Sequence, residues 1–385
     1  MAGRVEIQGY CDDRFASVKR VFADNFEYCS EVGASFAATV AGEVVADLWG
    51  GYADEARTRP WEEDTIVNVF SSTKVIAAVC ALVLVDRGQL NLDEPVATYW
   101  PEFAQAGKEK IPVRYLLSHT SGVAGFEEPI TTETLYDWEL ATGLLARQAP
   151  WWEPGAHSGY HSLTHGYLLG EVVRRVTGKT IGTFLREEVA GPLNAGFYIG
   201  LPEECDNRVA DVIQPAQLLP GDPGFTEPEP GSIRGKVMAN PARGLDAAND
   251  VGWRRAEIPA ANGHGNARAI ARIGTALACG GELDGVRLLG MPTIEKMIEG
   301  QSYGADLVLG DILRFGLGVE LNCRERYLGP NPRTFSWGGA GGSMVVVDLD
   351  ARACWAYTMN RMGRGAHFRN PRNLALSQAF FASLK

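Results

Sequence analysis

The sequence predicts an α/β (α+β) protein in which a sheet built from both ends of the chain carries an inserted, mostly helical domain. Two observations predict this. Apolar and β-branched runs typical of strands lie near both ends of the chain. Prolines divide the segment between them into short helical and loop-like stretches. We therefore expect residues 1–88 and 180–385 to form the α/β domain and residues 89–179 the helical domain, a division that suits 385 residues.

The first expected elements follow from apolar spacing and turn residues. They are a helix at 15–26, strands at 34–40 and 43–49, a short β-branched run at 65–70 and a helix at 73–87. Gly42 lies between the two strands, as a hairpin turn requires. Gly88 stands where the last of these helices is expected to end.

The same criteria predict the rest of the chain. Helices are expected at 113–117, 135–147, 162–178, 267–278, 293–299 and 374–384, and strands at 315–321, 344–348 and 354–359. Residues 215–241 are rich in proline and glycine, which predicts a long surface loop.

Composition excludes several classes of protein. Hydrophobic residues make up 45% and charged residues 22%, which is ordinary globular composition rather than that of a disordered or fibrous chain. The net charge is −11, whereas a nucleic-acid-binding protein usually has an excess of basic residues. The longest apolar run, residues 75–85, is too short for a membrane span of about 20 residues.

Cysteine usage indicates a reducing compartment. The seven cysteines are scattered, without a C-x-x-C pair, which argues against a disulfide framework and against a structural zinc site. The N-terminus lacks the apolar core of a secretory signal. We therefore expect a cytoplasmic protein with reduced thiols.

The most informative local pattern is Ser71-Ser72-Thr73-Lys74. Residues three apart share a helix face, so Lys74 can reach the Ser71 hydroxyl. A serine attacks a carbonyl only when a partner takes its proton, and a lysine with a lowered pKa can do so. A helix-initiating serine followed by a surface lysine gives the same four letters. Ser71 lies where an extended run meets an apolar helix, which favours the catalytic interpretation.

Two other patterns suggest chemistry that the context does not support. Residues 300–304 match G-x-S-x-G, but this motif needs a strand before Ser302 and a helix after it, and the sequence predicts the reverse. His157, His161 and His165 have the spacing of metal ligands on a helix. Proline and glycine interrupt that segment, and neither a carboxylate nor a cysteine completes a set, so we expect no metal.

Further segments add to the pattern around Ser71. They are the string LLSHTSG at 116–122, Tyr160-His161-Ser162 after a Pro-Gly turn, and Trp337-Gly338-Gly339 before a strand. Together with S-x-x-K, they resemble the serine β-lactamase and penicillin-binding protein superfamily over roughly residues 30–360. The similarity is greatest to its class C-like branch and to family VIII carboxylesterases. The resemblance implies a transpeptidase-like fold with a central antiparallel sheet flanked by helices and an active site at the domain interface.

The resemblance also implies roles for individual residues. Ser71 would be the nucleophile, Lys74 its proton partner, and Tyr160 a general base or proton relay. The backbone N–H groups of Ser71 and Ala340 would form the oxyanion hole. The residues expected to bind substrate are Trp337, Gly338 and Gly339. His119 in the LLSHTSG string is expected to be a structural hydrogen-bonding residue.

Purely structural roles remain open for Tyr160 and for the glycines that follow Trp337. A tyrosine after a Pro-Gly turn is often half-buried with a bonded hydroxyl, which is the structural interpretation of Tyr160. The glycines at 338–342 are compatible with a tight turn, with close approach of a substrate, or with both.

Two departures from the family pattern bear on substrate. Ser162 replaces the asparagine of the tyrosine motif, and Trp337 replaces the lysine that would hold a β-lactam carboxylate. The second change favours neutral esters, although Arg333 lies close enough in sequence to restore a positive charge.

We therefore expect a carboxylesterase that cleaves short-chain esters through an acyl-enzyme on Ser71 without a cofactor. The alternatives are a β-lactamase, a D-amino-acid peptidase or acyltransferase of the same superfamily, or a binding or sensor protein that is acylated and turns over poorly. The expected partner is a small-molecule ester. The natural ester, the acyl-chain length, the extent of β-lactam hydrolysis and the oligomeric state are left open, as is the choice of Lys74 or Tyr160 as primary base.

Overall fold

The computed structural model describes residues 5–215, 229, 231–242, 246–327, 329–363 and 370–385. A nine-stranded antiparallel sheet forms its centre, in the order β1-β3-β2-β13-β12-β11-β10-β9-β8. The strands are β1 (Ile7–Cys11), β2 (Gly33–Val40), β3 (Glu43–Gly51), β8 (Ser302–Ala305), β9 (Ile312–Phe315), β10 (Glu320–Leu321), β11 (Thr334–Gly338), β12 (Met344–Asp348) and β13 (Ala353–Met359). Two short pairs join β4 (Val67–Asn68) to β5 (His264–Gly265) and β6 (Glu282–Leu283) to β7 (Val286–Arg287).

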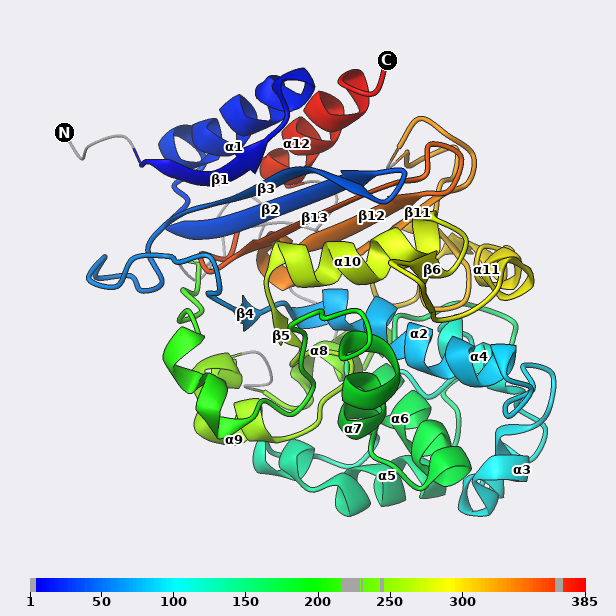
Figure 1. The fold of residues 1–385 in the computed structure, drawn as a ribbon. Helices are drawn as coiled ribbons and strands as arrows, with labels where there is room; N and C mark the ends of the chain where they lie inside the picture. Colours follow the sequence, from blue (N-terminus) through cyan, green and yellow to red (C-terminus); the bar gives the residue numbers. More distant parts are fainter. Residues whose placement is uncertain (1–4, 216–228, 230, 243–245, 328, 364–369) are drawn as a thin grey trace.

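The sheet is built from both ends of the chain, as the sequence predicts. β2 pairs along its whole length with β13, from Ala34 opposite Met359 to Val40 opposite Ala353. β12 and β11 continue the sheet from there. The fold is therefore that of the serine β-lactamases and transpeptidases, with a large antiparallel sheet between helices (Figure 1).

Helices cover both faces of the sheet (Figure 1). The helices are α1 (Ala16–Tyr28), α2 (Thr73–Asp86), α3 (Val96–Tyr99), α4 (Val113–Leu117), α5 (Trp138–Arg147), α6 (Thr164–Thr177), α7 (Ile181–Leu185), α8 (Ile233–Ala239), α9 (Val251–Arg255), α10 (Ala267–Ala278), α11 (Met291–Met297) and α12 (Pro371–Ala382). α1 and α12 lie side by side on one face, where the rings of Phe15 and Phe380 stack at 5.7 Å. α10 packs on the other face so closely that a Cβ on Gly274 would lie 2.5 Å from Cys354 Sγ.

α2 is the central helix of the larger core. Its residues from Thr73 to Leu84 are all buried. This is expected, because a helix that is apolar on all sides lies inside a protein. Ser71 lies directly before α2 and Lys74 lies in its first turn, so this burial fixes the backbone that carries both side chains.

Three expectations on secondary structure need correction. The expected strand at 315–321 is two strands, because the chain turns at Gly318 (φ +78°) and β10 returns against β9. β1 was not expected, since it lacks the apolar run of a buried strand, whereas β8 agrees with the strand expected after the helix at 293–299. The expected loop at 215–241 contains α8, while most of its first half lies outside the described residues.

The division into domains at 88/89 and 179/180 stays a prediction. In Figure 1, α7 and α9 lie on the same side of α10 as α5 and α6. Across the described residues, none of the helices is long and apolar enough to cross a membrane.

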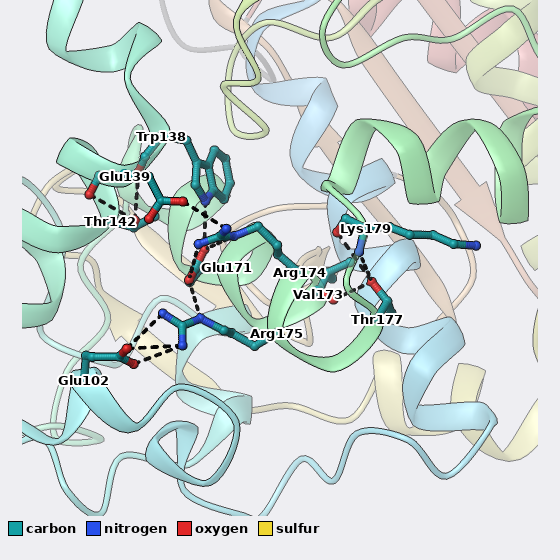
Figure 2. A network of polar contacts seen from close by, with 10 residues as sticks. All are labelled: Glu102, Trp138, Glu139, Thr142, Glu171, Val173, Arg174, Arg175, Thr177 and Lys179. Atoms are coloured by element: carbon teal, nitrogen blue, oxygen red, sulfur yellow. Dashed lines mark hydrogen bonds and ion pairs between the residues drawn. The ribbon is translucent and has the colours of Figure 1, made fainter.

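The buried carboxylate of Glu171 in α6 links this helix to α5 and, through Arg175, to the 3₁₀ helix Pro101–Ala104 (Figure 2). Glu171 Oε2 accepts hydrogen bonds from Trp138 Nε1 at 2.7 Å and Arg174 Nε at 2.8 Å. Glu171 Oε1 accepts from Arg175 Nε at 2.7 Å, and Arg175 also pairs with Glu102. Burial alone would raise the pKa of Glu171, but these hydrogen bonds outweigh it and lower the pKa.

We expect Glu171→Gln to reduce the free energy of unfolding by about 2 kcal/mol at neutral pH, the size of a hydrogen bond to a charged group. A carboxylate with a lowered folded-state pKa stabilises the fold above its unfolded pKa and loses this effect as pH falls through the folded pKa. The difference between wild type and variant should therefore shrink on acidification. Denaturant unfolding from pH 7 downward measures this, and a difference that is independent of pH would contradict it.

Candidate active site

Ser71 lies at a strained junction between β4 and α2. It is the middle residue of the 3₁₀ helix η2 (Phe70–Ser72), and Phe70 before it has a φ of +46°, which is rare for a residue with a side chain. Thr73 Oγ1 donates to the Phe70 carbonyl at 2.5 Å and accepts from the Gly263 N–H at 2.9 Å. Strained backbone held in this way is typical of functional sites.

Lys74 is buried against Ser71. Its Nζ lies 3.2 Å from Ser71 Oγ and donates to the carbonyl oxygens of Ser162 at 2.7 Å and Ala260 at 2.8 Å. The side chain is 1% exposed, and burial holds the pKa of Lys74 well below its ordinary value. A neutral amine has two N–H groups and one lone pair. The two carbonyls take both N–H groups, so the lone pair is left to accept the Ser71 proton.

Tyr160 approaches Ser71 Oγ from a second direction. Its hydroxyl lies 2.6 Å from Ser71 Oγ, and Lys74 Nζ lies 4.7 Å from the centre of its ring. Burial raises the pKa of Tyr160, so its hydroxyl keeps its proton and donates to Ser71. In the resting site, the hydrogen bonds can therefore run from Tyr160 to Ser71 and from Ser71 to Lys74.

The segment 339–343, which contains Ala340, packs against the segment 69–72, which contains Ser71. A Cβ on Gly339 would lie 2.1 Å from the Val69 carbonyl oxygen and 3.1 Å from Ser71 N, so only glycine fits there. Ser343 Oγ donates to the Val69 carbonyl at 2.6 Å and lies 3.0 Å from Ser72 Oγ. The 3₁₀ helix η8 (Ala340–Gly342) is thereby fixed beside the nucleophile.

Trp337 packs behind Tyr160 within an aromatic cluster. Its ring centre lies 5.3 Å from that of Tyr160, 5.6 Å from that of Phe315 and 6.1 Å from that of His119. It is only 2% exposed, so its neighbours, Tyr160 among them, cover almost all of its surface. Arg333, which sequence proximity suggested as a substitute cation, instead pairs with Glu295 and Asp350.

The buried histidines act as packing and hydrogen-bonding groups. His119 Nδ1 accepts from the backbone N–H of His161 at 3.1 Å, and the His119 ring contacts Tyr160 at 5.1 Å. His161 uses both ring nitrogens, at 2.7 Å from Ser121 Oγ and 2.6 Å from the Gly159 carbonyl. Burial lowers the pKa of His161 to about 4 and that of His119 well below its usual value, so both are neutral at pH 7. The exposed His157 lies apart from this buried group.

Asp306 was missed by the sequence analysis. Its Oδ1 accepts hydrogen bonds from the backbone N–H groups of Tyr160 at 3.0 Å and of Val308 and Leu309 at 2.9 Å each. It follows β8, the strand that carries the misleading G-x-S-x-G pattern. An aspartate that accepts hydrogen bonds from the backbone two and three residues later in the chain is typical of a turn. The sequence around Asp306 does not indicate its contact with Tyr160.

Comparison with known sequences gives matches along nearly the whole chain. A family model described as Beta-lactamase matches residues 19–379. Esterase/beta-lactamase LipL of Mycobacterium tuberculosis is 35% identical over 370 residues, covering 94% of this chain and 84% of LipL. Esterase EstB of Burkholderia gladioli is 33% identical over 195 residues, covering 45% of this chain and 48% of EstB.

Solved structures match the fold equally well. A family VIII carboxylesterase is 42% identical with a TM-score of 0.90, and the match covers 98% of this chain and 100% of that one. A penicillin-binding protein homologue from Caulobacter crescentus is 41% identical with a TM-score of 0.88 and the same coverage.

Proposed function

Since the chain belongs to the beta-lactamase family, we propose that it is a serine hydrolase, a carboxylesterase that cleaves short-chain esters through an acyl-enzyme on Ser71. One observation carries the proposal: Ser71 Oγ lies within hydrogen-bond reach of both the buried Lys74 amine and the Tyr160 hydroxyl. This is the arrangement that an activated nucleophile needs. The family VIII structure and the two esterase relatives support the ester as substrate class.

Acylation begins when Ser71 Oγ attacks the ester carbonyl carbon and its proton passes to the Lys74 lone pair. The carbonyl oxygen becomes an oxyanion, which the N–H groups of Ser71 and Ala340 are proposed to stabilise. One such donor typically contributes about 10²–10³-fold in rate. When the tetrahedral intermediate collapses, the C–O bond breaks. The leaving alcohol takes a proton from Tyr160, which Lys74 then reprotonates.

Deacylation repeats these steps with water as nucleophile. Water attacks the acyl carbon and gives its proton to the same base, and Ser71 Oγ leaves with a proton returned through Lys74 or Tyr160. A buried lysine suits this cycle because burial lowers its pKa, so that the amine can accept a proton and give it up again. We propose that Trp337, Gly338 and Gly339 border the acyl group along the edge of β11. A cytoplasmic location is part of the proposal, supported by seven free thiols.

β-Lactam hydrolysis is the second candidate activity, because the relative LipL carries both activities in its name. An acyltransferase would use the same acyl-enzyme with another alcohol in place of water. A sensor protein that is acylated but deacylates very slowly would release one equivalent of product in a burst and then stop. An esterase releases product steadily.

We expect kcat/KM for p-nitrophenyl butyrate to exceed that for nitrocefin. Nitrocefin brings a carboxylate, and β11 offers Trp337 where a lysine would neutralise that charge, so the anion loses hydration without a partner. Parallel steady-state assays of the two substrates measure the ratio. Arg333→Ala is the matched control and should leave the ratio unchanged, because Arg333 is already paired with Glu295 and Asp350. Equal or higher efficiency on nitrocefin would favour the β-lactamase.

A further inference from the structure

The glycine-rich segment after β11 is held by polar side chains at the start of α12. Arg372 Nη2 donates to the Gly341 carbonyl at 2.7 Å, and Asn370 Nδ2 donates to the same oxygen at 3.3 Å. Asn373 Nδ2 donates to the Gly342 carbonyl at 2.9 Å. Side chains from one helix thus bind two successive carbonyls of η8, the turn that begins at Ala340.

The conformation of this segment depends on glycine at two successive positions. Gly341 and Gly342 have φ values of +83° and +125°, and Cβ atoms there would lie 2.7 Å from Met362 Cγ and 2.5 Å from Asn370 Nδ2. Glycine is therefore required at both positions, yet glycine has the least restricted backbone of any residue. Backbone hydrogen bonds hold the segment in part, from the Gly342 N–H to the Gly339 carbonyl at 3.1 Å and from the Gly363 N–H to the Gly341 carbonyl at 2.7 Å, and the side chains of α12 add to them.

Arg372 is itself fixed by a buried carboxylate. Its side chain is 3% exposed, that of Glu31 is 0% exposed, and Arg372 Nη1 donates to Glu31 Oε2. Tyr357 donates its hydroxyl to the same Glu31 oxygen, and Arg372 Nη1 also binds the Arg361 carbonyl at 3.1 Å. Burying such a pair contributes little net stability because desolvation offsets the attraction. Stability alone therefore does not account for the pair.

We propose that Arg372, anchored by Glu31, is a positioning residue for the oxyanion hole. By holding the Gly341 carbonyl, it fixes η8 and the direction of the Ala340 N–H. The inference rests on the proposed roles of Ser71 and Ala340. An oxyanion hole acts on the transition state, so the loss should appear in kcat and not in KM. Misplacement of about 1 Å is enough to cost about 10²-fold.

The decisive variant is the double substitution Glu31→Gln/Arg372→Met. It removes both charges together, so no unpaired ion is left in the core. The Gly341 carbonyl loses the hydrogen bond from Arg372 and keeps those from the Gly363 N–H at 2.7 Å and from Asn370 Nδ2. We expect the variant to be folded, with an unchanged KM for p-nitrophenyl butyrate and kcat lower by about 10²-fold. A butyl boronic acid forms a tetrahedral adduct with the active serine, and its affinity should fall in parallel with kcat.

Glu171→Gln is the matched control, because it disturbs a buried carboxylate–arginine network away from Ser71. It should lower the unfolding midpoint without changing kcat or boronic acid affinity. A folded double variant with wild-type kcat and boronic acid affinity would overturn the proposal. If the double variant does not fold, Arg372→Lys decides in the same assays, because an ammonium cannot reach all partners of the guanidinium. A wild type with neither turnover nor boronic acid binding would instead refute the proposed function.

Discussion

Ser71→Ala should reduce kcat for p-nitrophenyl butyrate by about 10⁴-fold or more, since removing a serine nucleophile leaves only binding and the oxyanion hole. The variant should fold normally, because among the described residues Ser71 Oγ hydrogen-bonds to the two proton-transfer partners alone, and alanine suits the helical turn before α2. Intact mass after brief exposure to an activated ester should show one acyl adduct on the wild type and none on Ser71→Ala. Peptide mapping should place that adduct on Ser71.

Ser302→Ala is the matched control for this experiment. Ser302 begins β8 at the edge of the sheet, and a strand follows it where a nucleophile elbow needs a helix. The variant should keep wild-type kcat and the same adduct. Retained activity in Ser71→Ala together with loss in Ser302→Ala would overturn the assignment of the nucleophile.

Lys74→Ala and Tyr160→Phe should each lower kcat by about 10²–10⁴-fold, the usual contribution of a general acid–base group. Because both groups act on the same Ser71 proton, the double variant should be little worse than either single variant. If Tyr160→Phe matches the wild type in both kcat and KM, the tyrosine has no part in proton transfer.

The pH dependence separates the two partners. Protonated Lys74 has no lone pair for the Ser71 proton, so kcat/KM on an uncharged ester should fall as pH falls through the lowered Lys74 pKa. Tyr160→Phe should keep this acidic limb, and Lys74→Ala should lose it. The opposite pattern, a limb that persists in Lys74→Ala and disappears in Tyr160→Phe, would assign the base to tyrosine.

Local sequence was enough to predict the helix that follows Ser71 and carries Lys74, and the sheet built from both chain ends. Apolar runs and helix spacing are properties of neighbouring residues, and the comparisons confirm the family and fold they indicated. Lys74 could be placed against Ser71 because i and i+3 share a helix face. The meeting of Tyr160 with Ser71 was predicted only through the family resemblance, since they are 89 residues apart.

The missed features depend on distant contacts. Asp306 holds the backbone of Tyr160 from a strand edge, and Arg372 reaches Gly341 from the last helix. Neither contact leaves a periodic pattern around the residue that makes it. The role of Trp337 in substrate binding stays a prediction, and its ring contacts with Tyr160 and Phe315 are further long-range contacts that the sequence did not indicate.

The pairing of β2 with β13 has a consequence for synthesis of the protein. β2 is synthesised long before its partner β13, since even the nearest paired residues, Val40 and Ala353, are 313 residues apart (353 − 40). Until then, the almost wholly buried apolar strand Gly33–Val40 presents an open edge, a hazard that chaperones normally cover. Ala340 likewise joins Ser71 only when β11 and β12 have closed the sheet. The nascent chain is therefore expected to lack hydrolytic activity until β11, β12 and β13 have left the ribosome.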